Sequence, residues 1–144
     1  MADNISKLER SRVMATIKSV DTRPELVVRK LVYLLGYRYR VHMRSLPGCP
    51  DIVFASRRKI INVNGCFWHR HRCKAGQSTP ASRREYWLPK FSRNQARDQL
   101  VRRALRKAGW QVLTVWECQL RHPERVRARL AEFLVKPVAM RTHR

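Results

Sequence analysis

Acidic residues are scarce in this sequence, whereas basic residues are more than three times as common. The 144 residues include 10 Asp and Glu against 32 Lys and Arg, which gives a formal net charge of +22 at pH 7. Such an excess opposes folding through self-repulsion, so solubility alone explains it poorly. Nucleic acid is the favoured partner, because counterion release from phosphates would supply affinity, and an anionic membrane is the weaker alternative.

The sequence also lacks long apolar runs and paired-cysteine motifs. It contains no run of about eighteen apolar residues, and residues 1–11 lack the apolar segment of a signal peptide. We therefore expect a cytoplasmic protein that does not enter the membrane, in which thiols stay reduced. Its cysteines then read as metal ligands rather than disulfides; they are Cys49, Cys66, Cys73 and Cys118.

Capping residues and apolar periodicity predict the order α-α-β-β-β-α-β-α. The expected helices cover residues 6–19, 22–36 and 83–108 and a last segment that begins near 123. The expected strands cover residues 37–44, 51–54, 59–63 and 110–118, and residues 74–82 are expected to form a loop. This order predicts a single α/β domain with one mixed sheet flanked by helices.

The apolar residues of these helices predict which faces are buried. The second helix carries Val27, Leu31, Leu34 and Leu35. In the two later helices the expected buried residues are Trp87, Leu88, Phe91, Leu100, Ala104, Leu105, Val126, Leu130, Phe133 and Leu134.

The stretch "NGCFWHRHRC" (residues 64–73) places Cys66, His69, His71 and Cys73 within eight positions. Thiolates and imidazoles are the ligands that zinc prefers in a tetrahedral site. If the segment is extended, residues 69, 71 and 73 share a face, so either histidine is a possible ligand. Cys118 and Cys49 are the two candidates for the fourth ligand. The alternative without a metal is that the cysteines are separate buried thiols and the histidines face solvent.

Other cysteine chemistry is disfavoured by what the segment lacks. No C-x-x-C pair is present, which argues against a redox site, and a zinc deaminase would need a glutamate two positions after a ligating histidine. A structural zinc that fixes a loop is therefore the favoured interpretation.

Two of the few carboxylates have unusual settings. Asp51 follows Pro50 and leads directly into the apolar "IVF", so its charge needs either an arginine partner or a Mg²⁺ ion facing a phosphate. Glu25 lies three residues after Thr22, which is the spacing of a helix capping box, and a catalytic role is equally open.

Together these motifs resemble one known family. "PD" before a strand, "GCFWHRHRC", "REYW" and "VWEC" are similar to the very short patch repair (Vsr-type) endonucleases, bacterial enzymes with a restriction-endonuclease-like core. The similarity is collinear over residues 11–134, and the GCFWH-x-H-x-C block is highly specific. The family cuts the thymine strand at T:G mismatches, which arise by deamination of 5-methylcytosine, on the 5′ side of the thymine.

The resemblance implies a role for each matching residue. Asp51 and the carbonyl of Val63 would bind the catalytic Mg²⁺, and His69 would be the general base. Glu25 would support the water network, and Asp98 would orient a catalytic histidine. The implied ligands of a structural zinc are Cys66, His71, Cys73 and Cys118.

The resemblance also implies DNA contacts and a division of the chain. Phe67, Trp68 and Trp87 would wedge into the duplex from the major groove, and Met14 and Ile17 would enter the minor groove. From the sequence alone, Trp87, Met14 and Ile17 read equally well or better as core residues. The N-terminal helix that contacts DNA would lie in residues 1–20, the endonuclease core in 21–135 and a basic tail in 136–144.

Three positions depart from the family pattern. Asn64 stands where a second histidine assists the leaving group, and an amide donates a hydrogen bond but transfers no proton. Val63 replaces a side-chain hydroxyl, and Cys49 replaces a basic residue for a reason that the sequence does not supply. Nicking is still expected, with an altered rate.

The sequence therefore favours a Mg²⁺-dependent mismatch endonuclease that acts as a monomer on double-stranded DNA. Recruitment by mismatch-repair proteins stays open. The rival interpretations are a related nickase or restriction-type nuclease of different specificity, and a non-catalytic zinc-stabilised nucleic-acid-binding protein.

Overall fold

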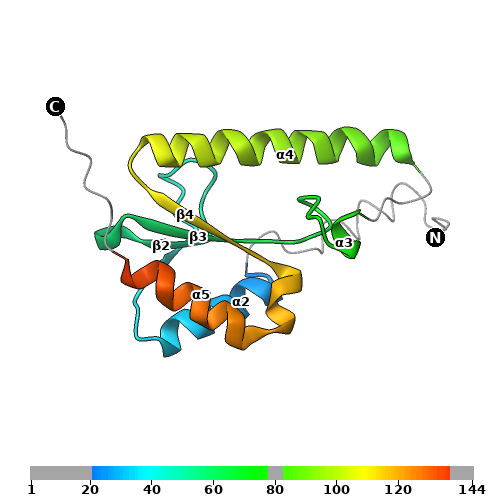
Figure 1. Cartoon of the computed structure of the whole chain (residues 1–144). Helices are drawn as coiled ribbons and strands as arrows, with labels where there is room; N and C mark the ends of the chain where they lie inside the picture. The colour runs from blue at the N-terminus through cyan, green and yellow to red at the C-terminus, as the bar shows by residue number, and fades with distance from the viewer. Residues whose placement is uncertain (1–20, 78–82, 137–144) are drawn as a thin grey trace.

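A four-stranded mixed sheet lies at the centre of the protein, in a computed structural model that describes residues 21–77 and 83–136 (Figure 1). The strands are β1 (Arg40–Val41), β2 (Ile52–Phe54), β3 (Lys59–Asn64) and β4 (Gln111–Trp116), in the spatial order β1-β2-β3-β4. β1, β2 and β3 pair antiparallel, and β3 pairs with β4 in parallel. The α/β class and the mixed sheet flanked by helices are confirmed.

Helices cover both faces of this sheet, which gives three layers (Figure 1). The longer helices are α2 (Arg23–Leu34), α4 (Arg84–Lys107) and α5 (Pro123–Val135), and the shorter ones are η1 (Ala55–Arg57), α3 (Lys74–Gln77) and η2 (Glu117–Arg121). Helix α4 lies on one face, whereas α2 and α5 lie on the other. None of the helices in the described ranges is both long and apolar enough to span a bilayer.

Alternation along β2 and β3 divides the core between the two faces. Ile52 and Ile61 belong to the cluster formed with α2 and α5, whereas Val53 and Ile60 pack with Leu105 of α4. Successive side chains of a strand point to opposite faces, so both faces of these strands are apolar. This explains why the sequences of β2 and β3 contain few polar residues.

The predicted strand over residues 37–44 was mostly wrong. Only Arg40 and Val41 pair with β2, and the left-handed conformation of His42 (φ 49°) ends the pairing. Tyr37 and Tyr39 still pack edge-on against Phe54, with centroids 6.4 Å apart in each case. The predicted common face is therefore correct for Tyr37 and Tyr39 but wrong for Val41, which is exposed, and for Met43, which packs in the core on the other side of the sheet.

Helix α4 is confirmed, but part of its predicted buried face is exposed. Phe91 and Leu105 are buried, whereas Leu88, Leu100 and Ala104 are exposed. A helix of 24 residues spans about 36 Å and a strand of six residues about 20 Å. The helix is therefore longer than the strands. Leu100 and Ala104, however, directly precede Val101 and Leu105, which pack on the sheet, so they are exposed because they lie on a side of the helix that faces away from it.

Three smaller differences concern the other helices. In α2 the buried apolar residues are Val28 and Val32, and Leu34 is exposed, so the buried face is rotated from the predicted one. Phe133 of α5 is half-buried, while its three other predicted residues are buried. Residues 74–77 form the single turn α3 instead of a loop.

Candidate functional site

The parallel pairing of β3 and β4 brings together two segments that are distant in sequence. Asn64 at the end of β3 is the register partner of Trp116 at the end of β4. Cys66 and Cys118 lie two residues beyond these partners. Because the strands are parallel, both of them end at the same edge of the sheet. The parallel register therefore places the two thiols side by side.

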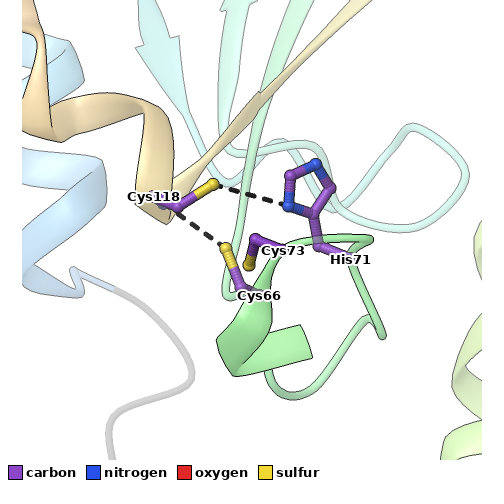
Figure 2. Close-up of side chains that lie close together, drawn as sticks. All are labelled: Cys66, His71, Cys73 and Cys118. Atoms are coloured by element: carbon purple, nitrogen blue, oxygen red, sulfur yellow. Dashed lines mark hydrogen bonds between the residues drawn. The ribbon is translucent and has the colours of Figure 1, made fainter. Parts of the chain in front are cut away.

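Four metal-ligating side chains converge at this point (Figure 2). One ligand atom each from Cys66, His71, Cys73 and Cys118 lies within 4.8 Å of the others. The Cys118 Sγ lies 3.4 Å from His71 Nδ1, and the Cys118 N–H donates to Cys66 Sγ at 3.4 Å. Tetrahedral zinc separates its sulfur and nitrogen ligands by about 3.5–3.8 Å. The donor set and spacing therefore fit a closed tetrahedral metal site.

The structure decides between the alternatives that the sequence left open. His71 belongs to the cluster and His69 does not. Cys118 belongs to it as well, whereas Cys49 lines the neighbouring cleft. The His71 ring stacks on Trp116 with centroids 4.3 Å apart, which fixes its orientation.

The environments of Cys66 and Cys73 shift the pKa values of their thiols in opposite directions. Burial raises the pKa of Cys66 to about 12, whereas a hydrogen bond with His71 lowers the pKa of Cys73 to about 6. A bound cation favours the thiolate form of its cysteine ligands. The buried Cys66 thiol is therefore the ligand that most needs a metal to ionise.

A cleft of about 1230 Å³ lies next to the cluster and contains the predicted acidic residues. Glu25, Asp51, Asn64, His69 and Asp98 all line it. These residues come from α2, the start of β2, the end of β3, the following loop and α4. The fold thus gathers side chains from five separate segments into one cavity.

Asp51 is half-buried among the residues that line this cleft. Its Oδ2 accepts a hydrogen bond from the Val63 N–H at 2.8 Å, and burial raises its pKa. Among the described residues, none of the ion pairs involves Asp51. The predicted arginine partner is therefore not found in this part of the chain, and Oδ1 is left available to a cation.

His69 is held by Asp98 from helix α4. The His69 Nδ1 lies 2.5 Å from Asp98 Oδ2, and the backbone N–H of His69 donates to the Gly65 carbonyl at 3.2 Å. An ionised carboxylate only accepts, so Nδ1 carries the proton and Nε2 keeps its lone pair. This arrangement leaves Nε2 suited to take a proton from water.

Glu25 has the contact of a helix cap and also borders the cleft. The Glu25 N–H donates to Thr22 Oγ1 at 3.4 Å, as in a helix cap, and Glu25 Oε2 accepts from the Asp21 N–H at 3.2 Å. Its side chain is 3% exposed and still borders the cleft. Burial and then the charge of Asp51 raise the pKa of Glu25.

The sequence did not single out two further residues of this region. Arg29 contacts Glu25 Oε2 at 3.2 Å, and His42 Nε2 lies 3.3 Å from the same oxygen. The signal for Arg29 was its position one helical turn after Glu25. No local signal identified His42, because its partners come from another element.

An aromatic group borders the cleft on the side of helix α4. Phe67 lies 5.2 Å from Trp68 and 5.8 Å from Trp87 between ring centroids, and Trp87 stacks on the buried Phe91. The Lys90 ammonium lies 5.1 Å from the Trp68 ring centroid. Trp87 therefore has a packing role that would not prevent contact with a ligand. Met14 and Ile17 lie outside the described residues.

Comparisons with known proteins identify the family of this chain. Residues 2–75 match the model of the family described as DNA mismatch endonuclease Vsr. The chain is 48% identical to the type II nicking enzyme V.XorIIP of Xanthomonas oryzae pv. oryzae, over 93% of this chain and 98% of that protein. It is 42% identical to the DNA mismatch endonuclease Vsr of Escherichia coli, over 88% of this chain and 80% of that protein.

Proposed function

Because the chain belongs to the Vsr family of DNA endonucleases, we propose that it nicks DNA on the 5′ side of the thymine in T:G mismatches with Mg²⁺ as cofactor. One observation carries this proposal beyond family membership. Asp51, with a carboxylate oxygen available, shares a cleft with His69, whose Nε2 is available as a base. Phosphodiester hydrolysis needs these two capacities close together.

Each residue of the cleft has a part in this reaction. Asp51 and the Val63 carbonyl would hold Mg²⁺, which supplies positive charge to stabilise the charge that develops on the phosphate. His69 Nε2 would take the proton from the attacking water while Asp98 keeps the ring in the correct tautomer. Asn64 would donate a hydrogen bond to the leaving oxygen without transferring a proton.

The neighbouring cluster would bind structural zinc through Cys66, His71, Cys73 and Cys118. It would fix residues 65–73, the loop that carries His69 and two aromatic residues. A zinc bound there needs no open position, because the chain supplies four ligands. Its contribution is therefore to hold the base and the DNA-contacting loop in place.

The aromatic group would supply mismatch selectivity. Unstacking a base step costs about a few kcal/mol and costs least at a mismatch, so a wedge of Phe67, Trp68 and Trp87 would favour weakly paired sites. Met14 and Ile17 would contact the minor groove. The excess of basic residues would bind phosphates without regard to sequence.

A nicking assay on end-labelled duplexes tests the proposal. T:G and C:G duplexes in several flanking sequences are incubated with Mg²⁺, with and without EDTA. We expect one nick, 5′ of the thymine, only in the mismatched duplex and only with Mg²⁺. Equal cutting of the matched duplex would overturn the mismatch specificity.

A nickase of different specificity is the second candidate, because relatives are named type II nicking enzymes. It predicts a nick that depends on flanking sequence but not on the mismatch. A non-catalytic zinc-stabilised binder, the third possibility, would bind all duplexes and cut none. Action as a monomer in the cytoplasm, with or without mismatch-repair proteins, belongs to the same proposal.

A further inference from the structure

Arg29, in the middle of helix α2, lies at the centre of a group formed with Asp21, Glu25 and His42 beside the cleft. Its Nη2 lies 2.7 Å from Asp21 Oδ1, 3.2 Å from Glu25 Oε2 and 2.8 Å from His42 Nε2. The Arg29 side chain is 14% exposed, and Glu25 is 3% exposed. Three segments, those before α2, within α2 and after β1, therefore meet on one guanidinium nitrogen.

The chemistry of arginine fixes the direction of these contacts. A guanidinium only donates, so a neutral His42 ring with its proton on Nδ1 accepts at Nε2. The two hydrogens of Arg29 Nη2 are then shared among its three acceptors. Asp21, Glu25 and His42 could in principle hold a metal, since their ligand atoms lie within 4.8 Å of one another. Arg29 already supplies a positive charge at that point and would repel a cation. The group is therefore a clamp of Arg29 and His42 on a carboxylate rather than a metal site.

The clamp uses one oxygen of Glu25 and leaves the other available. Oε2 accepts from the Asp21 N–H and from Arg29, whereas Oε1 has no hydrogen bond to any described residue. Glu25 borders the same cleft as Asp51. Holding Oε2 therefore fixes the carboxylate while Oε1 is left for water in the cleft.

A contribution to stability does not by itself explain why these residues form the clamp. The Arg29 Nε is buried and is the one buried side-chain nitrogen or oxygen of residues 21–77 and 83–136 without a hydrogen-bond partner. An unpaired buried donor costs about 1–3 kcal/mol. Thr22 already caps the helix. An arrangement that is costly for stability and borders a cleft indicates a functional purpose.

We propose that Arg29 and His42 are positioning residues that hold Glu25 beside Asp51, so that Oε1 orders the water used in strand cleavage. Arg29 would act directly on Glu25, and His42 would act by holding Arg29. This inference rests on the proposed nuclease function and adds two residues to it. It predicts that both residues matter only while Glu25 is a carboxylate.

A double-mutant cycle tests this dependence. Single-turnover nicking is measured over a range of Mg²⁺ concentrations for wild type, Arg29→Met, Glu25→Gln and the double variant. A misplaced catalytic group costs on the order of a hundredfold. We expect Arg29→Met to slow nicking tenfold to about a hundredfold and to raise the Mg²⁺ concentration for half-maximal rate. In the Glu25→Gln background the same change should cost less than about twofold.

Matched variants separate positioning from folding and from charge. Lys30→Met removes a positive charge from the next residue of α2 and should nick like wild type. Arg29→Lys keeps a donor and should recover part of the rate. His42→Gln keeps an acceptor for Arg29 and should stay within about threefold of wild type, whereas His42→Leu should show the loss of Arg29→Met. Thermal unfolding and DNA affinity are measured for every variant.

The outcomes distinguish the two proposals. If wild type nicks no duplex, the nuclease proposal fails whatever the variants do. If wild type nicks and Arg29→Met slows nicking equally in both backgrounds, Arg29 does not act through Glu25 and the clamp is overturned. If Arg29→Met fails to fold, the His42→Leu cycle with Glu25→Gln decides by the same criterion.

Discussion

The cysteine–histidine cluster and the carboxylate cleft are neighbours, but they differ in how far the side chains of the protein complete the site. In the cluster, four ligand atoms of the chain lie within 4.8 Å of one another and face a common point (Figure 2). In the cleft, the charge of Asp51 adds to burial in raising the pKa of Glu25, and the described residues give Asp51 no ion pair. The first site needs one ion to be complete, whereas the second has room and charge for an ion and a substrate.

The difference separates stability from reactivity. A closed set of four ligands leaves no position for a substrate, so a metal bound there would stabilise a loop. Buried carboxylates with raised pKa values cost stability, as is common at active sites. The loop of residues 65–73 links the two sites, because it carries both His69 and three of the four cluster ligands. Each prediction below tests one side of this comparison.

Asp51→Asn should give the largest change in activity. Loss of the charge stabilisation that a metal supplies costs several kcal/mol, so the nicking rate should fall about 10³-fold or more. DNA affinity in Mg²⁺-free buffer should stay within about threefold, since the phosphate contacts are basic. Glu132→Gln, which removes an exposed carboxylate of α5, is the control. Nicking by Asp51→Asn at the wild-type rate would remove Asp51 from the mechanism.

Cys118→Ser should give the largest change in stability. Structural zinc contributes about 10–16 kcal/mol of apparent binding free energy in small zinc domains, so losing a thiolate ligand should lower the unfolding free energy by several kcal/mol. Zinc content measured by atomic emission should fall from one per chain in parallel. Cys49→Ser, in the cleft, should change stability by about 0.5 kcal/mol or less. Equal effects of the two substitutions would contradict the assignment of the cluster.

His69→Ala should slow nicking without loss of zinc. Removal of a general base typically costs about 10²–10⁴-fold. Asp98→Asn should cost less, because the amide oxygen can still accept from Nδ1. The informative result is the pairing of a lower rate with an unchanged zinc content. Zinc loss in His69→Ala would mean that the two sites share a histidine.

The smallest expected effect is a gain in stability for Asp51→Asn in the absence of Mg²⁺. A raised pKa means that the native state holds the proton more tightly than the unfolded state, so the ionised carboxylate destabilises the native state at pH 7. The substitution should therefore raise the unfolding free energy by about 1 kcal/mol at pH 7. The gain should shrink as the pH falls through the raised pKa, because wild-type Asp51 then becomes neutral. Urea unfolding at pH 7 and at pH 5 measures it, and a loss of stability at pH 7 would contradict the sign.

The sequence predicted the strands of the core well, but it predicted poorly which apolar residues of the helices are buried. "DIVF" and "KIINV" are apolar on both faces because both faces of the sheet are covered, and this leaves an unambiguous pattern. Leu100 is apolar and exposed because it lies on a side of α4 that faces away from the sheet, whereas the next residue, Val101, packs on the sheet. The ladder at residues 37–44 ended early because His42 adopts a left-handed conformation that alternation does not encode.

The sequence by itself determined the strong positive charge, the kinds of ligand present and the location of Asp51 at the start of a buried strand. Tertiary structure decided which residues meet. Cys66 joins Cys118, 52 residues away, because β3 and β4 are parallel and in register. His69 contacts Asp98, and Glu25 contacts Arg29 and His42, because separate helices and loops border one cleft. Spacing along the chain specifies local geometry alone, whereas the partners of a buried polar group are specified by strand register and helix packing.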